Sequence, residues 1–236
     1  MADDSSRPGV AVVTGAASGL GAAVAGALTA AGWRVAGIDL RPSAATALGV
    51  EVDVTDAAAV EAAVDRVERE LGPVGALVTA AGVYEMLPVE EIDDLRWHRM
   101  MAVNLSGTAN ACAAVVPRMV SRGEGGVVTV SSDLGVGGSQ GDVHYAASKG
   151  AIVGFTRALA AEVGGTGVAV NTVAPGAADT PMLEDTSPWR SADFLATLPV
   201  QRLIRPDEIA AAALFLLEAG TALSGQVLSP NAGATI

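Results

Sequence analysis

The sequence predicts an α/β protein in which a mainly parallel, doubly wound sheet carries helices on both faces. Short runs rich in β-branched residues alternate with longer alanine-rich runs of helical character, which is the pattern of successive βαβ units. The short runs are apolar almost throughout, as expected of strands that are buried on both sides. A chain of 236 residues can form one such domain with a sizeable core, and we expect a single domain over residues 1–236.

Seven strands and five helices are predicted in order along the chain. The strands are expected at residues 10–14, 34–38, 50–52, 75–79, 127–130, 168–173 and 226–228, and the helices at about 19–31, 56–71, 95–121, 145–163 and 206–217. The 56–71 run is amphipathic and predicts a surface helix. The 206–217 run opens with Pro206, Asp207 and Glu208. These residues predict a helix start, because proline fits a first turn and acids suit the positive end of the helix dipole.

One long irregular stretch, residues 177–205, contains Pro181, Pro188 and Pro199. Segments of this length without regular structure are uncommon in compact domains and are usually functional. We therefore expect residues 177–205 to form a lid over a substrate site.

Composition excludes several classes of protein. The net charge of −12 argues against nucleic acid and anionic membranes as partners, because both select basic surfaces. The single cysteine, Cys112, fits a reducing compartment, and its apolar surroundings predict a buried structural thiol. The polar N-terminus predicts no signal peptide, and the longest apolar run, 209–217, is shorter than the about 20 residues of a membrane span. We therefore expect a soluble, cytoplasmic protein.

A glycine-rich turn, TGAASGLG at residues 14–21, follows the first strand and opens the first helix. Glycines permit a tight turn and let backbone N–H groups approach a pyrophosphate at a helix N-terminus. The spacing is Gly-x-x-x-Gly-x-Gly rather than Gly-x-Gly-x-x-Gly, but the position after a strand favours a nucleotide site over a packing turn.

Acids follow the second and third strands. Asp39 lies about 20 residues after the glycine turn, where an acid accepts both ribose hydroxyls of NAD and repels a 2′-phosphate. Arg41 lies two residues later and weakens that preference, and the alternative role for Asp39 is to cap the next segment. Asp53 and Val54 end the third strand and either contact the adenine or form the turn before the next helix.

The only lysine of the chain, Lys149, lies four residues after Tyr145, one of two tyrosines. On a helix this spacing places both side chains on one face. Tyrosine has a pKa of about 10, and a fixed cation beside it favours the phenolate. The pair therefore predicts acid/base chemistry, with an ordinary exposed lysine as the alternative.

Five segments in order resemble motifs of the short-chain dehydrogenase/reductase family. They are TGAASGLG at 14–21, Asn104 in VNLSG, Ser132 in VVTVSS, YAASK at 145–149, and APG at 174–176 followed by DTPM. The resemblance covers residues 10–233 and implies a Rossmann-type domain with a seven-stranded sheet. It implies an NAD-dependent oxidoreductase that interconverts a secondary alcohol and a ketone.

The resemblance also implies a role for each catalytic candidate. Tyr145 is the general acid/base, and Ser132 hydrogen-bonds the same substrate oxygen. Lys149 lowers the pKa of Tyr145 and binds the nicotinamide ribose, while Asn104 helps to seat a water beside Lys149. The candidate cofactor residues are Gly15, Ser18, Gly19, Leu20, Gly21, Asp39, Asp53, Val54, Ala81, Gly82, Tyr145, Lys149, Pro175, Gly176 and Thr180.

Three segments depart from the family pattern. Thr79, Ala80, Ala81 and Gly82 stand where the family has Asn-Asn-Ala-Gly, and Asn231, Ala232 and Gly233 stand where it has Asp-Gly-Gly. The third departure is the 39–50 segment, which is short and leaves little room for a full second helix.

The substrate stays open at this point. Dihydrodiol dehydrogenases that oxidise 2,3-dihydro-2,3-dihydroxybenzoate and ketoreductases for 3-oxoacyl carrier proteins are alternatives, and a non-catalytic NAD-binding regulator is a third. Asp39 favours NAD over NADP. The resemblance implies that the long helices near 95 and 145 pair across subunits, and their alanine-rich faces allow close contact, so we expect a homotetramer or a dimer. Two histidines and one cysteine give no support for a metal site. His144 is expected at the helix entry, facing the pocket or solvent. A hydrolase triad of Ser132, Asp142 and His144 is not expected, because Ser132 does not lie in a Gly-x-Ser-x-Gly turn.

Overall fold

The computed structural model describes residues 9–234 and contains one seven-stranded sheet with the order β3-β2-β1-β4-β5-β6-β7. Every adjacent pair of strands is parallel. Strands β2 and β3 are added in turn on one side of β1. The chain then crosses to the other side of β1, where β4, β5, β6 and β7 follow in order. The predicted doubly wound, Rossmann-type α/β fold is confirmed.

Most predicted elements agree with the structure to within two residues. The strands are β1 Val10–Thr14, β2 Arg34–Asp39, β3 Leu48–Glu51, β4 Val74–Thr79, β5 Gly125–Val130, β6 Val168–Val173 and β7 Val227–Leu228. The α-helices are α1 Gly19–Ala30, α2 Ala57–Leu71, α3 Asp94–Met101, α4 Gly107–Arg122, α5 Leu134–Gly137, α6 Val143–Glu162, α7 Ala192–Thr197 and α8 Pro206–Glu218. Within residues 9–234, no helix is both long and apolar enough to cross a membrane.

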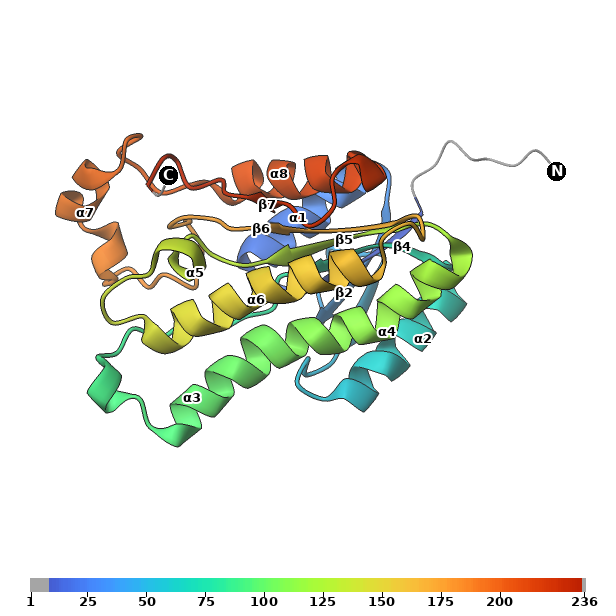
Figure 1. Cartoon of the computed structure of the whole chain (residues 1–236), viewed down its shortest axis with the longest axis horizontal. Coiled ribbons are helices and arrows are strands. Elements are labelled where there is room, and N and C mark those ends of the chain that lie inside the picture. Colours follow the sequence, from blue (N-terminus) through green and yellow to red (C-terminus); the bar gives the residue numbers. More distant parts are fainter. Residues whose placement is uncertain (1–8, 235–236) are drawn as a thin grey trace.

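Helices cover both faces of the sheet, with α1 and α8 on one side and α2, α4 and α6 on the other (Figure 1). Successive side chains of a strand point to opposite faces, so Val10 and Val12 pack beneath α2 and α4, and Ala11 and Val13 pack against α1 and α8. All residues of β1 are therefore buried, which explains why its sequence is apolar without alternation.

The helix predicted over 95–121 is one continuous rod with a change of winding in its middle. Between α3 and α4, residues Ala102–Ser106 form a π-helical turn, a local widening that is frequent at functional sites. This turn contains Asn104. The short helices α5 and α7 were not predicted, because four to six residues are too few to show a helical period.

The connection from β2 to β3 contains no helix, as its length predicts. Instead, the loop lies directly on the sheet, and two glycines make the close contact possible. A Cβ on Gly37 would lie 3.2 Å from the Thr46 side chain, and a Cβ on Gly49 would lie 3.0 Å from the Ser43 carbonyl oxygen. At this end of the sheet a single loop takes the place of a helical layer.

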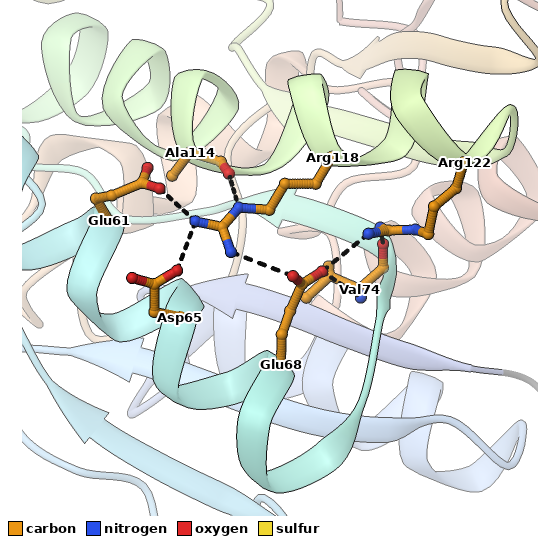
Figure 2. Close-up of polar contacts among 7 residues, drawn as sticks. All are labelled: Glu61, Asp65, Glu68, Val74, Ala114, Arg118 and Arg122. Atoms are coloured by element: carbon orange, nitrogen blue, oxygen red, sulfur yellow. Dashed lines mark hydrogen bonds and ion pairs between the residues drawn. The ribbon is translucent and has the colours of Figure 1, made fainter.

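Charged side chains join α2 to α4 at the edge of the molecule (Figure 2). The Arg118 guanidinium forms ion pairs with Glu61, with Asp65 at 2.8 Å and with Glu68 at 3.1 Å. Arg122 contacts the other oxygen of Glu68 at 3.1 Å. Burial raises the pKa of Glu68, but its hydrogen bond from a backbone N–H and the two arginines outweigh burial and lower the pKa overall. One arginine thus contacts three acids on successive turns of α2.

Replacing Arg118 with alanine is expected to lower the free energy of unfolding by about 2 kcal/mol, since three carboxylates lose a shared, partly buried partner. Thermal unfolding of Arg66→Ala, which breaks the exposed Arg66–Glu70 pair, is the control and should change by only about 0.3–0.5 kcal/mol. The folded-state pKa of Glu68 is lowered, so its contribution is complete above its unfolded pKa and disappears as pH falls. The difference between wild type and Arg118→Ala should therefore shrink below about pH 4. Equal losses in the two variants would contradict the network.

Candidate active site

A cavity of about 760 Å³ opens at the carboxyl ends of the strands. Its walls come from the glycine turn after β1, the ends of β2, β4, β5 and β6, one face of α6, and the 177–198 part of the predicted lid. The cavity spans the point where the strand order reverses between β1 and β4, which is where ligands bind in open α/β sheets. Every candidate cofactor residue lines this cavity, and so do Ser132, Tyr145 and Lys149.

The glycine turn is shaped by backbone contacts that leave no room for side chains. Gly15 has a φ of 71°, and a Cβ there would lie 2.7 Å from the Ala81 nitrogen. A Cβ on Gly21 would collide with the Gly15 carbonyl group. The turn therefore presents bare backbone to the cavity at the N-terminus of α1, an arrangement that suits a pyrophosphate.

Asp39 closes the same end of the cavity. One carboxylate oxygen accepts a hydrogen bond from the Ala17 nitrogen at 3.0 Å, and the other accepts one from the Arg41 nitrogen at 3.2 Å. The carboxylate is thus held against the glycine turn, 22 residues away in sequence. This is the position in which an acid would accept hydrogen bonds from an adenosine ribose, so the residues present fit a dinucleotide.

Asp53 has the turn role that the sequence left as an alternative. Its Oδ1 accepts hydrogen bonds from the Thr55 nitrogen at 2.9 Å and the Thr55 hydroxyl at 2.8 Å. Asp53 and Val54 still line the cavity. Val54 is buried against Gly107, where a Cβ would lie only 2.6 Å from the valine side chain.

Tyr145 and Lys149 share the cavity face of α6, opposite the end of β5. The Lys149 Nζ donates a hydrogen bond to the Val130 carbonyl oxygen at 2.9 Å and lies 5.7 Å from the centre of the Tyr145 ring. Both side chains are buried. Ser131, which does not fit the catalytic spacing, donates a hydrogen bond to the Lys149 carbonyl oxygen at 2.7 Å and so anchors α6.

Burial controls the pKa values of this pair. It raises the pKa of Tyr145, a nearby Ser132 hydroxyl lowers it, and the charges of Asp133 and Asp142 raise it further. Burial also lowers the pKa of Lys149 to about 8. Taken together, these effects raise the pKa of Tyr145, with desolvation of the phenolate as the largest cause, and the lowering of this pKa by Lys149 stays a prediction.

Asn104 is fully buried and does not line the cavity. Its Oδ1 accepts a hydrogen bond from the Val83 nitrogen at 2.8 Å, and its Nδ2 donates to the Val83 carbonyl oxygen and the Ser148 hydroxyl, both at 3.0 Å. A Cβ on Gly82 would lie 3.1 Å from Asn104 Oδ1 and 3.6 Å from Lys149 Nζ. Asn104 and Lys149 therefore converge on Gly82, with Asn104 one layer behind the cavity wall.

Tyr84, Asp133 and Trp189 are among the cavity residues to which the sequence analysis gave no role. The Tyr84 ring packs edge-on against Tyr145, with ring centres 4.9 Å apart. The Trp189 indole nitrogen donates a hydrogen bond to the Tyr84 hydroxyl at 2.7 Å, which ties the predicted lid to the wall beside Tyr145. The signal in the sequence that could have found Tyr84 and Asp133 is their position. Tyr84 lies two residues after Gly82, and Asp133 directly follows Ser132.

His144 lies in the first turn of α6, as expected, but it is fully buried and faces neither the cavity nor solvent. Among the described residues, neither ring nitrogen has a hydrogen-bond partner, and the Glu85 carboxylate lies 3.9 Å away. His144 makes no bond to Ser132 in the part of the chain that is described, so the hydrolase triad is wrong. Cys112 is buried, and burial raises the pKa of its thiol to about 12, which confirms the structural role.

The departures from the family pattern have local effects. Within residues 9–234 the Thr79 hydroxyl is buried without a hydrogen-bond partner, while the Ala81 nitrogen donates to the Thr14 hydroxyl at 3.2 Å. Ala232 adopts a left-handed φ of 57° where the family has glycine. Neither change touches Ser132, Tyr145 or Lys149.

The sheet and the cavity at its carboxyl edge define the class: an α/β protein of dinucleotide-binding fold. Residues 9–191 match the short chain dehydrogenase family. The chain is 41% identical to D-threitol dehydrogenase of Mycolicibacterium smegmatis, over 96% of this chain and 93% of that protein. It is 34% identical to a 3-oxoacyl-acyl-carrier-protein reductase of Escherichia coli, over 95% and 96% of the two chains.

Among solved structures, ligand-free aldohexose dehydrogenase of Thermoplasma acidophilum superimposes with a TM-score of 0.90 at 28% identity, over 97% of this chain and 94% of that one. The chain therefore belongs to the short-chain dehydrogenase/reductase family of oxidoreductases, whose dehydrogenases use nicotinamide nucleotides.

Proposed function

We propose that this chain is an NAD-dependent oxidoreductase that interconverts a secondary alcohol and a ketone. The observation that carries the proposal is that Tyr145, Lys149 and Ser132 lie together at one end of the cavity and Asp39 at the other. A nicotinamide cofactor would span the two ends and supply hydride exchange with the substrate carbon. The glycine turn and Asp39 would hold its adenosine part, and Lys149, Pro175, Gly176 and Thr180 its nicotinamide part.

In this proposal the protein's own groups handle the proton and the developing charge. Tyr145 donates a proton to a ketone oxygen or removes one from an alcohol, and the Ser132 hydroxyl hydrogen-bonds the same oxygen. Asn104 holds the turn around Gly82 through both Val83 main-chain groups, and its further role in this proposal is to help seat a water beside Lys149. Lys149 keeps a cation next to the phenol and also contacts the cofactor ribose.

We also propose that the whole chain, residues 1–236, works as one domain in which residues 177–205 are the substrate lid. Support comes from Met182, Leu183, Trp189, Phe194 and Leu198, which belong to this segment and line the cavity. The helices α4 and α6 lie side by side on one face of the sheet (Figure 1), and we propose that this face pairs between copies in a homotetramer or a dimer.

Cofactor preference is set by Asp39 in this proposal. We expect the wild type to prefer NAD, because the carboxylate repels a 2′-phosphate, and Asp39→Asn to improve kcat/KM with NADP about tenfold or more relative to NAD. Asp53→Asn is a matched control, since Asp53 also lines the cavity but its carboxylate is held by Thr55. Initial rates with both cofactors measure the ratio. A wild type that prefers NADP would rule out this role for Asp39.

The test of the proposed function is a panel of secondary alcohols and ketones assayed with both cofactors. We expect NADH formation from at least one neutral alcohol. A 3-oxoacyl carrier protein belongs in the panel because an Escherichia coli relative is named for that activity, although the net charge of −12 opposes an acidic carrier protein. Tight NAD binding without turnover of any substrate would favour a non-catalytic regulator instead.

A further inference from the structure

Asp133 is a buried acid in the cavity to which the proposed mechanism gives no role. It directly follows Ser132, is only 7% exposed and lines the cavity. Its backbone nitrogen donates to the Pro175 carbonyl oxygen at 2.9 Å, which fixes the residue between the ends of β5 and β6. The acid is therefore held rigidly beside the candidate catalytic serine.

The Asp133 carboxylate has acceptor capacity that the protein does not fill. The Ser132 hydroxyl donates to its Oδ1 over a long 3.3 Å, and nearby backbone N–H groups assist. Within residues 9–234 no arginine, lysine or histidine stabilises its charge, and burial raises its pKa. A carboxylate has about four acceptor sites, and a buried charge without a cation is costly unless further donors reach it.

We propose that Asp133 accepts a hydrogen bond from a second substrate hydroxyl, so that the preferred substrates are neutral vicinal diols and polyols. This inference rests on the proposed function. If Ser132 contacts the reacting oxygen, an acceptor 3.3 Å from the serine oxygen lies beside the next carbon of the substrate. The neighbouring oxygen of a vicinal diol is about one hydrogen-bond length, ~2.8 Å, from the first, so both oxygens of the diol find partners.

The same carboxylate selects against acids. A 2-hydroxy acid would place its own carboxylate where a diol places a hydroxyl, and two like charges in a buried cavity repel strongly. The remaining lid side of the cavity is mostly apolar, with Leu183, Trp189 and Phe194. These side chains contribute hydrocarbon contact and no charge. Arg99 and Lys149 also line the cavity, but Asp133 is the charge that lies directly against Ser132, where the substrate oxygen is bound in the proposed function.

The test compares substrates of similar size in the full-length enzyme with NAD: the stereoisomers of 2,3-butanediol, 2-butanol and 2-hydroxybutanoate. In the wild type we expect kcat/KM to be highest for a diol. In Asp133→Asn the advantage of the diol over 2-butanol should fall about tenfold to a hundredfold, the cost of losing a charged hydrogen bond. Oxidation of 2-hydroxybutanoate should rise. Because a folding defect lowers all rates, opposite changes for diol and acid are specific to the charge.

Asp142→Asn is the matched control, since Asp142 is also a buried acid near Tyr145 but does not line the cavity. Its diol-to-alcohol ratio should stay that of the wild type. Equal loss for diol and mono-alcohol in Asp133→Asn would overturn the inference, because Asp133 would then only position Ser132. If the wild type oxidises no alcohol, the proposed function fails. Titration of the intrinsic tryptophan fluorescence with 2,3-butanediol then decides, and equal dissociation constants in wild type and Asp133→Asn would overturn the inference as well.

Discussion

Replacing Tyr145 with phenylalanine is expected to lower kcat/KM by about 10²–10⁴-fold, the usual contribution of a positioned acid/base. The change removes one hydroxyl and keeps the ring that packs edge-on against Tyr84, so the structure of the cavity should persist. Steady-state rates in both directions measure the effect, and cofactor binding and thermal unfolding should match the wild type. A rate within threefold of the wild type would rule out Tyr145 as the acid/base.

Tyr84 provides the control, because it is the only other tyrosine in the chain and lies in the same wall. Tyr84→Phe removes the acceptor of the Trp189 hydrogen bond but no reacting group, so the loss should be much smaller and fall mainly on KM. The pH dependence adds a second readout. Burial raises the pKa of Tyr145, so the protonated phenol predominates at neutral pH. Ketone reduction should be favoured there, and alcohol oxidation should increase as pH rises.

Lys149→Arg should also lose most of the activity, about 10²-fold or more, although the charge is retained. The lysine side chain is 5% exposed, and its Nζ is aimed at the Val130 carbonyl oxygen at 2.9 Å. Arginine's planar fork differs in shape and reach from the compact lysine ammonium, so we expect it not to reproduce this contact. Kinetics with saturating NAD are the measurement. A near wild-type rate would show that charge alone matters.

Lys149→Met separates catalysis from stability. Burial lowers the pKa of Lys149 from 10.5 to about 8, so holding the charged form in the folded protein costs on the order of 3 kcal/mol at neutral pH. Because the folded-state pKa is lowered, this penalty is largest at low pH and disappears as pH rises through the unfolded pKa. The methionine variant should therefore be inactive yet unfold at a temperature no lower than the wild type near pH 7. A clearly less stable variant would contradict this account.

The fold was predictable because its rules are local. Periods of two and of about 3.6 residues identify strands and helices, and the strand-helix alternation then implies a parallel sheet. The π-helical turn at Ala102–Ser106 was not predictable, since it is maintained by bonds from Asn104 to Val83 and Ser148, which lie 21 and 44 residues away. No pattern within a helix records such partners.

The candidate site was also predictable only in part. Gly15 and Asp39 were found because strand ends meet at one edge of a parallel sheet, whereas Tyr145 was found through the spacing to Lys149 and the resemblance to the family. The Tyr84–Trp189 bond joins residues 105 positions apart through an irregular segment, and no sequence rule specifies that contact. Burial is the largest cause of the raised pKa of Tyr145, and spacing reveals a neighbouring cation but not the extent of burial.

The loop that replaces a helix between β2 and β3 has a consequence for motion. The edge strand β3 is four residues long and is covered on that side by a loop, where the rest of the sheet has packed helices. Segments with few buried apolar contacts open at the lowest free energy, so amide hydrogens of β3 and the loop should exchange before those of β1 or α6. We therefore expect the Asp39 end of the cavity to open locally while the helix that carries Tyr145 stays folded.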